Sequence, residues 1–239
     1  MFKIYREQVT VWLYRNFKIL LGLLILCTVI ALSLTVYNKI RRDKEIKAKD
    51  NLLSFQKALN DLRGEPKKKT ELFNLNSREK DNLIFTDQMK IQAQAYRKAI
   101  EEHKNFKITL YFVIDLADFY YRYGQKDLAK ELLSGFSFPL EKNTFNQMVS
   151  FQLASYYMNE KDCDKSLSLF EKLISNKFAK AFHVESRLQK GICLEHLNRP
   201  KEALTEYNRV SIENADSYLG RQAKDYKNLL ILKQKLKEK

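Results

Sequence analysis

One short pattern occurs three times in this chain at a fixed interval, between Leu116 and Val210. Each copy holds a small residue, then a second small residue, then a large one. The three sets are Ala117, Ala154 and Gly191, then Ala129, Ser166 and Ala203, then Leu133, Phe170 and Tyr207. Within every set the step is 37 residues, since 154 − 117 and 191 − 154 are both 37. A period of this size is typical of stacked supersecondary units.

The pattern predicts that each copy is two helices joined by a short turn. Small residues in both helices allow the backbones to approach closely, and the large residue fills the groove of the partner helix. The expected turns are 123–127, 159–162 and 198–200. Gly124 suits the end of a helix, and Pro200 suits the first turn of the next. An ordinary helical bundle with accidental similarity is the alternative.

The repeats resemble the tetratricopeptide repeat (TPR) family, whose pattern is W-x2-L-G-x2-Y, then A-x3-F, then P. None of the copies has Trp at its front or Pro at its end, and Lys190 stands where Leu is usual. The period also exceeds the usual length of about 34 residues by about three. The resemblance implies divergent TPR-like hairpins.

Composition favours long helices, because 239 residues contain only six Gly and three Pro. The net charge of +14 is spread over helix faces and has no clustered arginines with interleaved aromatics, so we expect no nucleic-acid partner. The cysteines Cys27, Cys163 and Cys193 have no spacing of a zinc site or redox pair.

An uncharged run of 19 residues, Ile19–Tyr37, follows a short basic tail, residues 1–18. As a helix it spans about 28 Å, close to the hydrocarbon core of a bilayer. Trp12, Tyr14 and Tyr37 suit the two membrane interfaces. We therefore expect a transmembrane helix at 19–38 that contacts the bilayer; a cleaved signal peptide is the alternative.

Residues 39–104 are expected to form a helical stalk and a first hairpin. The first helix carries an apolar stripe and ends at Arg63–Pro66. The stripe consists of Ile46, Leu52, Leu53, Phe55, Ala58, Leu59 and Leu62. Lys67–Lys69 reads as a solvated loop or as a contact with lipid headgroups. A second helix is predicted at about 86–103.

Residues 105–239 are expected to hold the three repeats and a C-terminal capping helix at about 216–237. We find no phosphate loop, no catalytic motif and no metal-ligand spacing, so we predict no enzyme, no cofactor, no metal and no small-molecule substrate. The predicted function is protein binding.

The TPR register implies a binding groove lined by the first helix of each repeat. Its members are aromatic, methionine-rich and partly charged, which suits adaptable peptide binding. We predict the groove residues to be Tyr111, Asp118, Tyr121, Arg122, Met148, Phe151, Ser155, Met158, Glu185 and Leu188. The chain's own C-terminal helix filling this groove is the alternative. The Lys and Asn of TPR domains that grip chaperone C-termini are absent at the fifth and ninth places.

The whole layout resembles the bacterial inner-membrane family called ancillary SecYEG translocon subunit, or YfgM-like. The stretches that carry this resemblance are Ile19–Tyr37, the helix with Ala93, Tyr96 and Ala99, and Leu116-Ala117 with its echoes. The resemblance implies a cytoplasmic N-terminus, periplasmic repeats, and a scaffolding role beside the translocon and periplasmic chaperones. The positive-inside rule alone leans slightly toward a cytoplasmic C-terminal domain.

Together these features predict an all-α protein, with a single-pass transmembrane helix followed by an α-solenoid of divergent TPR-like hairpins. We expect a membrane-anchored adaptor that binds a protein partner, with the translocon or chaperones as candidates. A structural, self-assembling membrane protein without a peptide ligand is the alternative.

Overall fold

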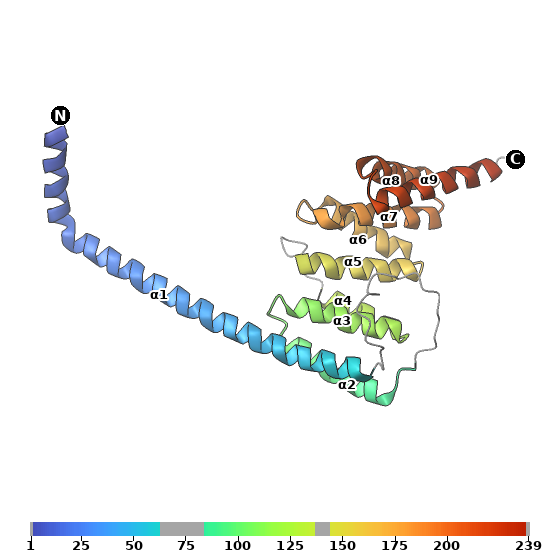
Figure 1. Ribbon diagram of the computed structural model, residues 1–239, viewed down its shortest axis with the longest axis horizontal. Helices are drawn as coiled ribbons and strands as arrows, with labels where there is room; N and C mark the ends of the chain where they lie inside the picture. Colours follow the sequence, from blue (N-terminus) through green and yellow to red (C-terminus); the bar gives the residue numbers. More distant parts are fainter. Residues whose placement is uncertain (1, 63–83, 137–143, 238–239) are drawn as a thin grey trace. The chain divides into compact units, whose positions relative to one another are not determined.

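The computed structural model describes residues 2–62, 84–136 and 144–237, and every regular element in these ranges is a helix (Figure 1). The chain divides into two units, residues 1–50 and 51–239. The helices are α1 (Phe2–Leu62), α2 (Asp87–Glu102), α3 (Thr109–Arg122), α4 (Lys126–Gly135), α5 (Thr144–Asn159), α6 (Cys163–Ser175), α7 (Lys180–His196), α8 (Pro200–Glu213) and α9 (Tyr218–Lys237).

The first unit consists of the greater part of α1. Helix begins at Phe2, so residues 2–18 of the predicted tail belong to the same helix as the apolar run. The apolar side chains described between Ile19 and Tyr37 are exposed. By length and composition this helix is able to cross a membrane, a test that a signal sequence also passes.

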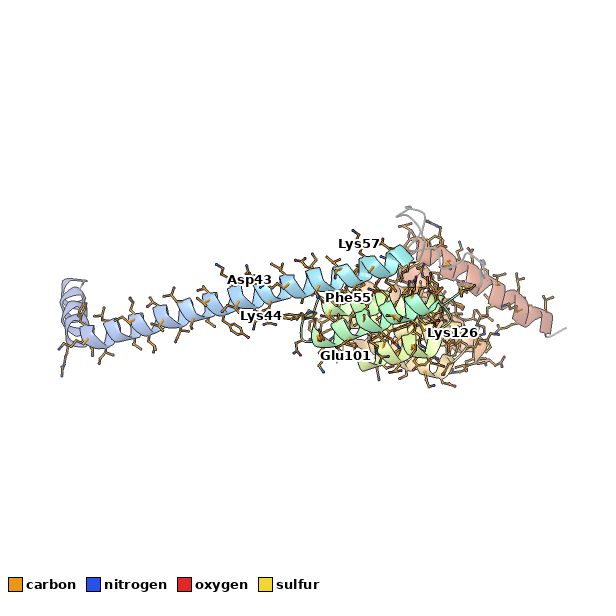
Figure 2. All side chains as sticks on the ribbon, turned by 90° about the horizontal axis from the view of Figure 1, so that it is seen from below. Asp43, Lys44, Phe55, Lys57, Glu101 and Lys126 are labelled. Carbon is orange, nitrogen blue, oxygen red and sulfur yellow. The ribbon has the colours of Figure 1, made fainter. Side chains whose placement is uncertain are left out.

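Residues 51–62 of α1 belong to the second unit and bury one face. Leu52 and Leu59 are fully buried, and Phe55 stacks on Tyr96 of α2 with ring centroids 6.3 Å apart. Figure 2 shows Phe55 on the side of α1 that faces α2. The predicted stripe is wrong at Ile46 and Leu53, which are 56% and 39% exposed because they lie off the buried face. The predicted stop at 63–66 and the loop at 67–69 lie outside the described residues.

Helix α2 matches the predicted second helix closely. Thr86 caps its start, since the Thr86 Oγ1 accepts a hydrogen bond from the Met89 backbone N–H at 3.3 Å. Its buried residues are Met89, Ala93, Tyr96, Ala99 and Ile100, the face that the sequence predicted. The apolar period therefore identified this helix correctly.

From α2 to α9, helices that are consecutive in the chain lie side by side (Figure 1). The second helix of each hairpin packs on the first, and the first helices α5, α7 and α9 each contact the two helices before them. Helix α9 thus contacts α7 and α8, and among the described helices no other. The alternative in which the C-terminal helix fills the predicted groove is therefore wrong for α3 and α5.

The three hairpin turns have the same backbone geometry. The residue in the left-handed region is Gly124 (φ 77°), Lys161 (φ 63°) and Asn198 (φ 55°), again 37 residues apart. The backbone N–H of the residue that follows donates a hydrogen bond to a carbonyl of the preceding helix, which closes each turn. The donor and acceptor pairs are Gln125 to Tyr120 (2.8 Å), Asp162 to Tyr157 (2.9 Å) and Arg199 to Leu194 (2.9 Å). The period in sequence is therefore a period in backbone structure.

The small residues lie where the paired helices meet, as predicted. Ala154 and Ser166 are fully buried, and the Ser166 hydroxyl donates to the Ala154 carbonyl at 2.9 Å. In the next hairpin a Cβ at Gly191 would collide with the ring of Tyr207. Close approach of the two helices therefore requires a small residue at both sites.

Candidate functional site

The second place of each first helix carries Tyr111 on α3, Met148 on α5 and Glu185 on α7. Tyr111 is 46% exposed and rests edge-on against Phe112, with ring centroids 5.3 Å apart. Met148 and Glu185 are half-buried. Burial raises the pKa of Glu185, and none of the described residues forms a hydrogen bond or ion pair with its carboxylate. This carboxylate is therefore desolvated without compensation.

The fifth place faces the core rather than a groove. Leu188 is 1% exposed and belongs to the same core cluster as Tyr207, so its assignment to the groove is wrong. Phe151 is half-buried, with its ring 5.8 Å from Phe170 and 5.6 Å from Phe182 of α7. Phe151 thus packs against the neighbouring first helix and Leu188 lies in the core, so neither side chain is fully open to a partner.

The ninth and thirteenth places on α3 hold an ion pair. The Arg122 Nε lies 2.7 Å from the Asp118 Oδ2, and the Arg122 side chain is 46% exposed. On α5 the ninth place is Ser155, whose hydroxyl donates to the Phe151 carbonyl at 2.9 Å within its own helix. The ion pair of the predicted surface therefore lies on α3, and its remaining charged residue, Glu185, lies on α7.

The twelfth place brings two helices together through aromatic rings. Tyr121 stacks on Tyr156 of α5, with centroids 4.0 Å apart and planes 6° from parallel. Lys126 lies 5.6 Å from the centroid of the Tyr121 ring. Burial, followed by the nearby Glu160 carboxylate, raises the pKa of Tyr121. The equivalent Met158 is half-buried and packs against two core clusters.

The accessible part of the predicted surface is therefore Tyr111 with the Asp118–Arg122 pair, joined to the partly covered Tyr121 stack. Tyr111 and Asp118 are seven residues apart, so they share one face of α3 about two turns from one another. Exposed aromatic and arginine side chains are typical of a protein-binding surface. The arrangement holds no nucleophile with an adjacent base. Among the residues that the structure describes, no three His, Cys, Asp or Glu side chains are grouped to bind a metal.

Two polar groupings in the third repeat escaped sequence reasoning. The Glu206 carboxylate pairs with Arg187 at 3.2 Å and with Lys190 at 3.1 Å. The buried Cys193 thiol hydrogen-bonds with Cys163, and burial raises its pKa to about 12. A thiol with this pKa is a poor nucleophile at neutral pH. The sequence could have indicated the first grouping through the opposite charges of Arg187 and Lys190 in one helix and Glu206 in the next.

Comparison with family models gives one match, to the tetratricopeptide repeat-like domain, over residues 11–227. No curated protein matches the chain. No solved structure matches it either. The matched stretch contains the apolar run, α2 and all three hairpins, which is most of the chain. Domains of this kind are typically protein-interaction scaffolds without enzymatic activity. The chain belongs to the tetratricopeptide repeat-like domain family.

Proposed function

We propose that this protein is a single-pass membrane-anchored adaptor whose TPR-like repeats bind a protein partner close to the bilayer. Residues 19–38 form the anchor, residues 39–104 the stalk and first hairpin, and residues 105–239 an α-solenoid of repeats. The observation that carries the proposal is the threefold hairpin with one backbone geometry, within a chain that belongs to a protein-interaction family.

Two features of α1 support a lasting anchor. The hydroxyls in the apolar run are satisfied within the helix, as a bilayer requires. Thr28, Ser33 and Thr35 donate to the carbonyls three residues earlier at 2.7, 2.8 and 2.7 Å. The family match also begins before the run, at residue 11, which favours a retained segment over a cleaved signal.

The anchor has a direct test. Deletion of residues 1–38 should move the protein from the membrane pellet to the supernatant while its circular dichroism stays strongly helical. Replacing Ile25 and Ile30 by Lys in the full chain is the matched control, since two charges in the run should also prevent stable insertion. A truncated protein that stays with the membrane would contradict the anchor.

The likeness in layout to the YfgM-like family leads us to propose periplasmic repeats, with the translocon or periplasmic chaperones as partners. A reporter that is active only in the periplasm, fused after Lys239, should then be active. Protection of the C-terminal domain from protease added to spheroplasts would place the repeats in the cytoplasm and exclude periplasmic chaperones.

The partner-binding surface is tested from Tyr111, because its ring is 46% exposed and contacts the ring of Phe112 in its own helix. A photoreactive phenylalanine analogue at position 111, introduced in cells that naturally contain the protein, should form one dominant adduct with another protein. Tyr218, which is 69% exposed at the start of α9, is the matched control position. Mass spectrometry of the adduct identifies the partner.

Three outcomes of this crosslinking contradict the proposal. Equal adducts from positions 111 and 218 would show that the α3 surface has no preference. An adduct made only of a second copy of the chain would favour the self-assembling alternative. Absence of any adduct at saturating illumination would remove the α3 surface from the account.

A further inference from the structure

Helix α9 occupies the position of a first helix in a repeat. It packs on α8 and α7 in the way that α7 packs on α6 and α5. The register of 37 residues holds as well, since buried Ser186 and Cys193 of α7 correspond to buried Ala223 and Leu230 of α9. Among the described residues no helix follows α9 to complete the pair.

The face of α9 that a second helix would cover is open. On α7 the corresponding face is buried under α8, with Leu188 and Leu194 each 1% exposed. Their equivalents on α9 are Asp225, which is exposed, and Ile231, which is half-buried. Register and exposure therefore agree that α9 has an unoccupied packing face.

A groove of about 630 Å³ runs along this face between α8 and α9. Its walls carry Leu204 and Ile212 of α8 and Ile231 of α9, and Ile212 is 67% exposed. Lys227 of α9 lies at its edge, where its Nζ donates to the Asn208 Oδ1 at 3.2 Å. Thr205 and Asn208 also line the groove, as do Arg209 and Glu213, which neutralise each other in an ion pair at 2.8 Å. The three apolar side chains and the remaining cation of Lys227 suit the apolar face of an amphipathic helix.

Charge identifies the kind of helix that fits. In the third repeat Arg187 and Lys190 of α7 hold the Glu206 carboxylate of α8. Their equivalents on α9 are Lys224 and Lys227, and no carboxylate of the described residues pairs with either. A helix that packs on α9 as α8 packs on α7 should therefore carry an acidic residue where α8 carries Glu206.

The same charges disfavour a second copy of α9 as the occupant. Over residues 218–237 there are six basic residues, Arg221, Lys224, Lys227, Lys233, Lys235 and Lys237, against the single acidic Asp225. Two such helices side by side repel each other. We propose that the α8–α9 groove is a docking site for an acidic amphipathic helix of a partner protein, which packs on α9 as α8 packs on α7.

This site is distinct from the α3 surface of the proposed function, so either proposal can fail alone. The test uses the full chain in detergent micelles and a fluorescent peptide of residues 200–213 as the probe. The peptide is stapled between positions 201 and 205, which are exposed in α8. Fluorescence anisotropy at low ionic strength should show saturable binding.

Charge reversal decides where the peptide binds. The variant Lys224→Glu/Lys227→Glu should weaken binding at least tenfold, and a Glu206→Lys peptide should restore it on that variant. Circular dichroism checks that the variant keeps its fold, which we expect because Lys224 is exposed and Lys227 is only half-buried. Ile231→Asp, which changes the apolar floor, should also abolish binding.

Two results would overturn the proposal. One is the absence of saturable binding, or binding that the charge reversal leaves unchanged, as when the peptide simply replaces α8 in its own hairpin. The other is a dimer in analytical ultracentrifugation that dissociates on Ile231→Asp, since a second copy would then be the occupant.

Discussion

The second and third repeats reach the same hairpin geometry through different contacts. In α5–α6 the helix pair is held by Ala154 against Ser166, with Phe170 fully buried beyond them. In α7–α8 the ring of Tyr207 lies directly against Gly191, and Tyr207 donates a hydrogen bond to the Glu195 Oε1 at 2.7 Å.

The charges differ more than the shapes. The places that hold Arg187, Lys190 and Glu206 in the third repeat hold Ser150, Leu153 and Leu169 in the second. An ion-pair cluster with side chains between 13 and 19% exposed thus stands where the second repeat has a hydroxyl and two leucines. Spacing of small and large residues therefore sets the backbone, and the chemistry of the remaining contacts is free to vary.

The largest effect is expected from the large residue of the second repeat. Phe170→Ala should lower the free energy of unfolding by about 3–5 kcal/mol, because a fully buried ring leaves a cavity. Phe170→Leu copies Leu133 of the first repeat and should cost less than about 1.5 kcal/mol. Denaturant unfolding of residues 39–239 measures both. Equal losses would mean that the three sites are not equivalent.

Overpacking the small site should come next. Ala154→Trp places a large ring where the Ala154 carbonyl accepts the Ser166 hydroxyl, so it should cost about 1–3 kcal/mol or more. Ala154→Gly copies Gly191 and should cost only about 1 kcal/mol, from helix propensity. An unchanged melting temperature for the Trp variant would show that the helices do not meet at Ala154.

The turns should respond more weakly and in opposite directions. Lys161 is held at a left-handed φ of 63°, which costs a non-glycine residue roughly 1–2 kcal/mol. Lys161→Gly should therefore stabilise by about 0.5–1 kcal/mol after the entropy of the unfolded glycine is counted. Gly124→Ala should destabilise by about 1 kcal/mol, and Lys161→Ala should be close to neutral. Thermal unfolding compares the three, and a destabilising Lys161→Gly would contradict the turn geometry.

The smallest effect is expected at the second place, where Glu185 replaces the Tyr and Met of the other repeats. Burial raises the pKa of Glu185 above its ordinary value of 4.5, so the folded state binds more protons than the unfolded state. Glu185 therefore adds stability as pH falls through its folded pKa, and this is lost as pH rises. Glu185→Gln should raise the melting temperature at pH 7 and give no gain at pH 4. A gain that is equal at both pH values would exclude titration of Glu185.

The sequence was sufficient for the helices, the hairpin pairing and the turns, because small residues at 117, 154 and 191 restrict packing to one arrangement. It failed at Leu188, where the family register predicted a groove position. The register gives the spacing of residues along a first helix. It does not give the rotation of that helix relative to the next first helix, and this rotation brings Phe151 against Phe182. The sequence also did not predict the open face of α9, because the exposure of a helix face depends on which other helices pack against it.

The most direct test of the account is a graft between the repeats. Glu206→Leu alone should cost roughly 1–3 kcal/mol, because Arg187 stays partly buried without its carboxylate and Lys190 keeps only its pair with Glu171 at 3.1 Å. The triple change Arg187→Ser/Lys190→Leu/Glu206→Leu installs the residues of the second repeat and should bring the free energy of unfolding to within about 1 kcal/mol of the original chain, or above it. A triple variant as unstable as the single one would show that the two hairpins do not share one interchangeable geometry.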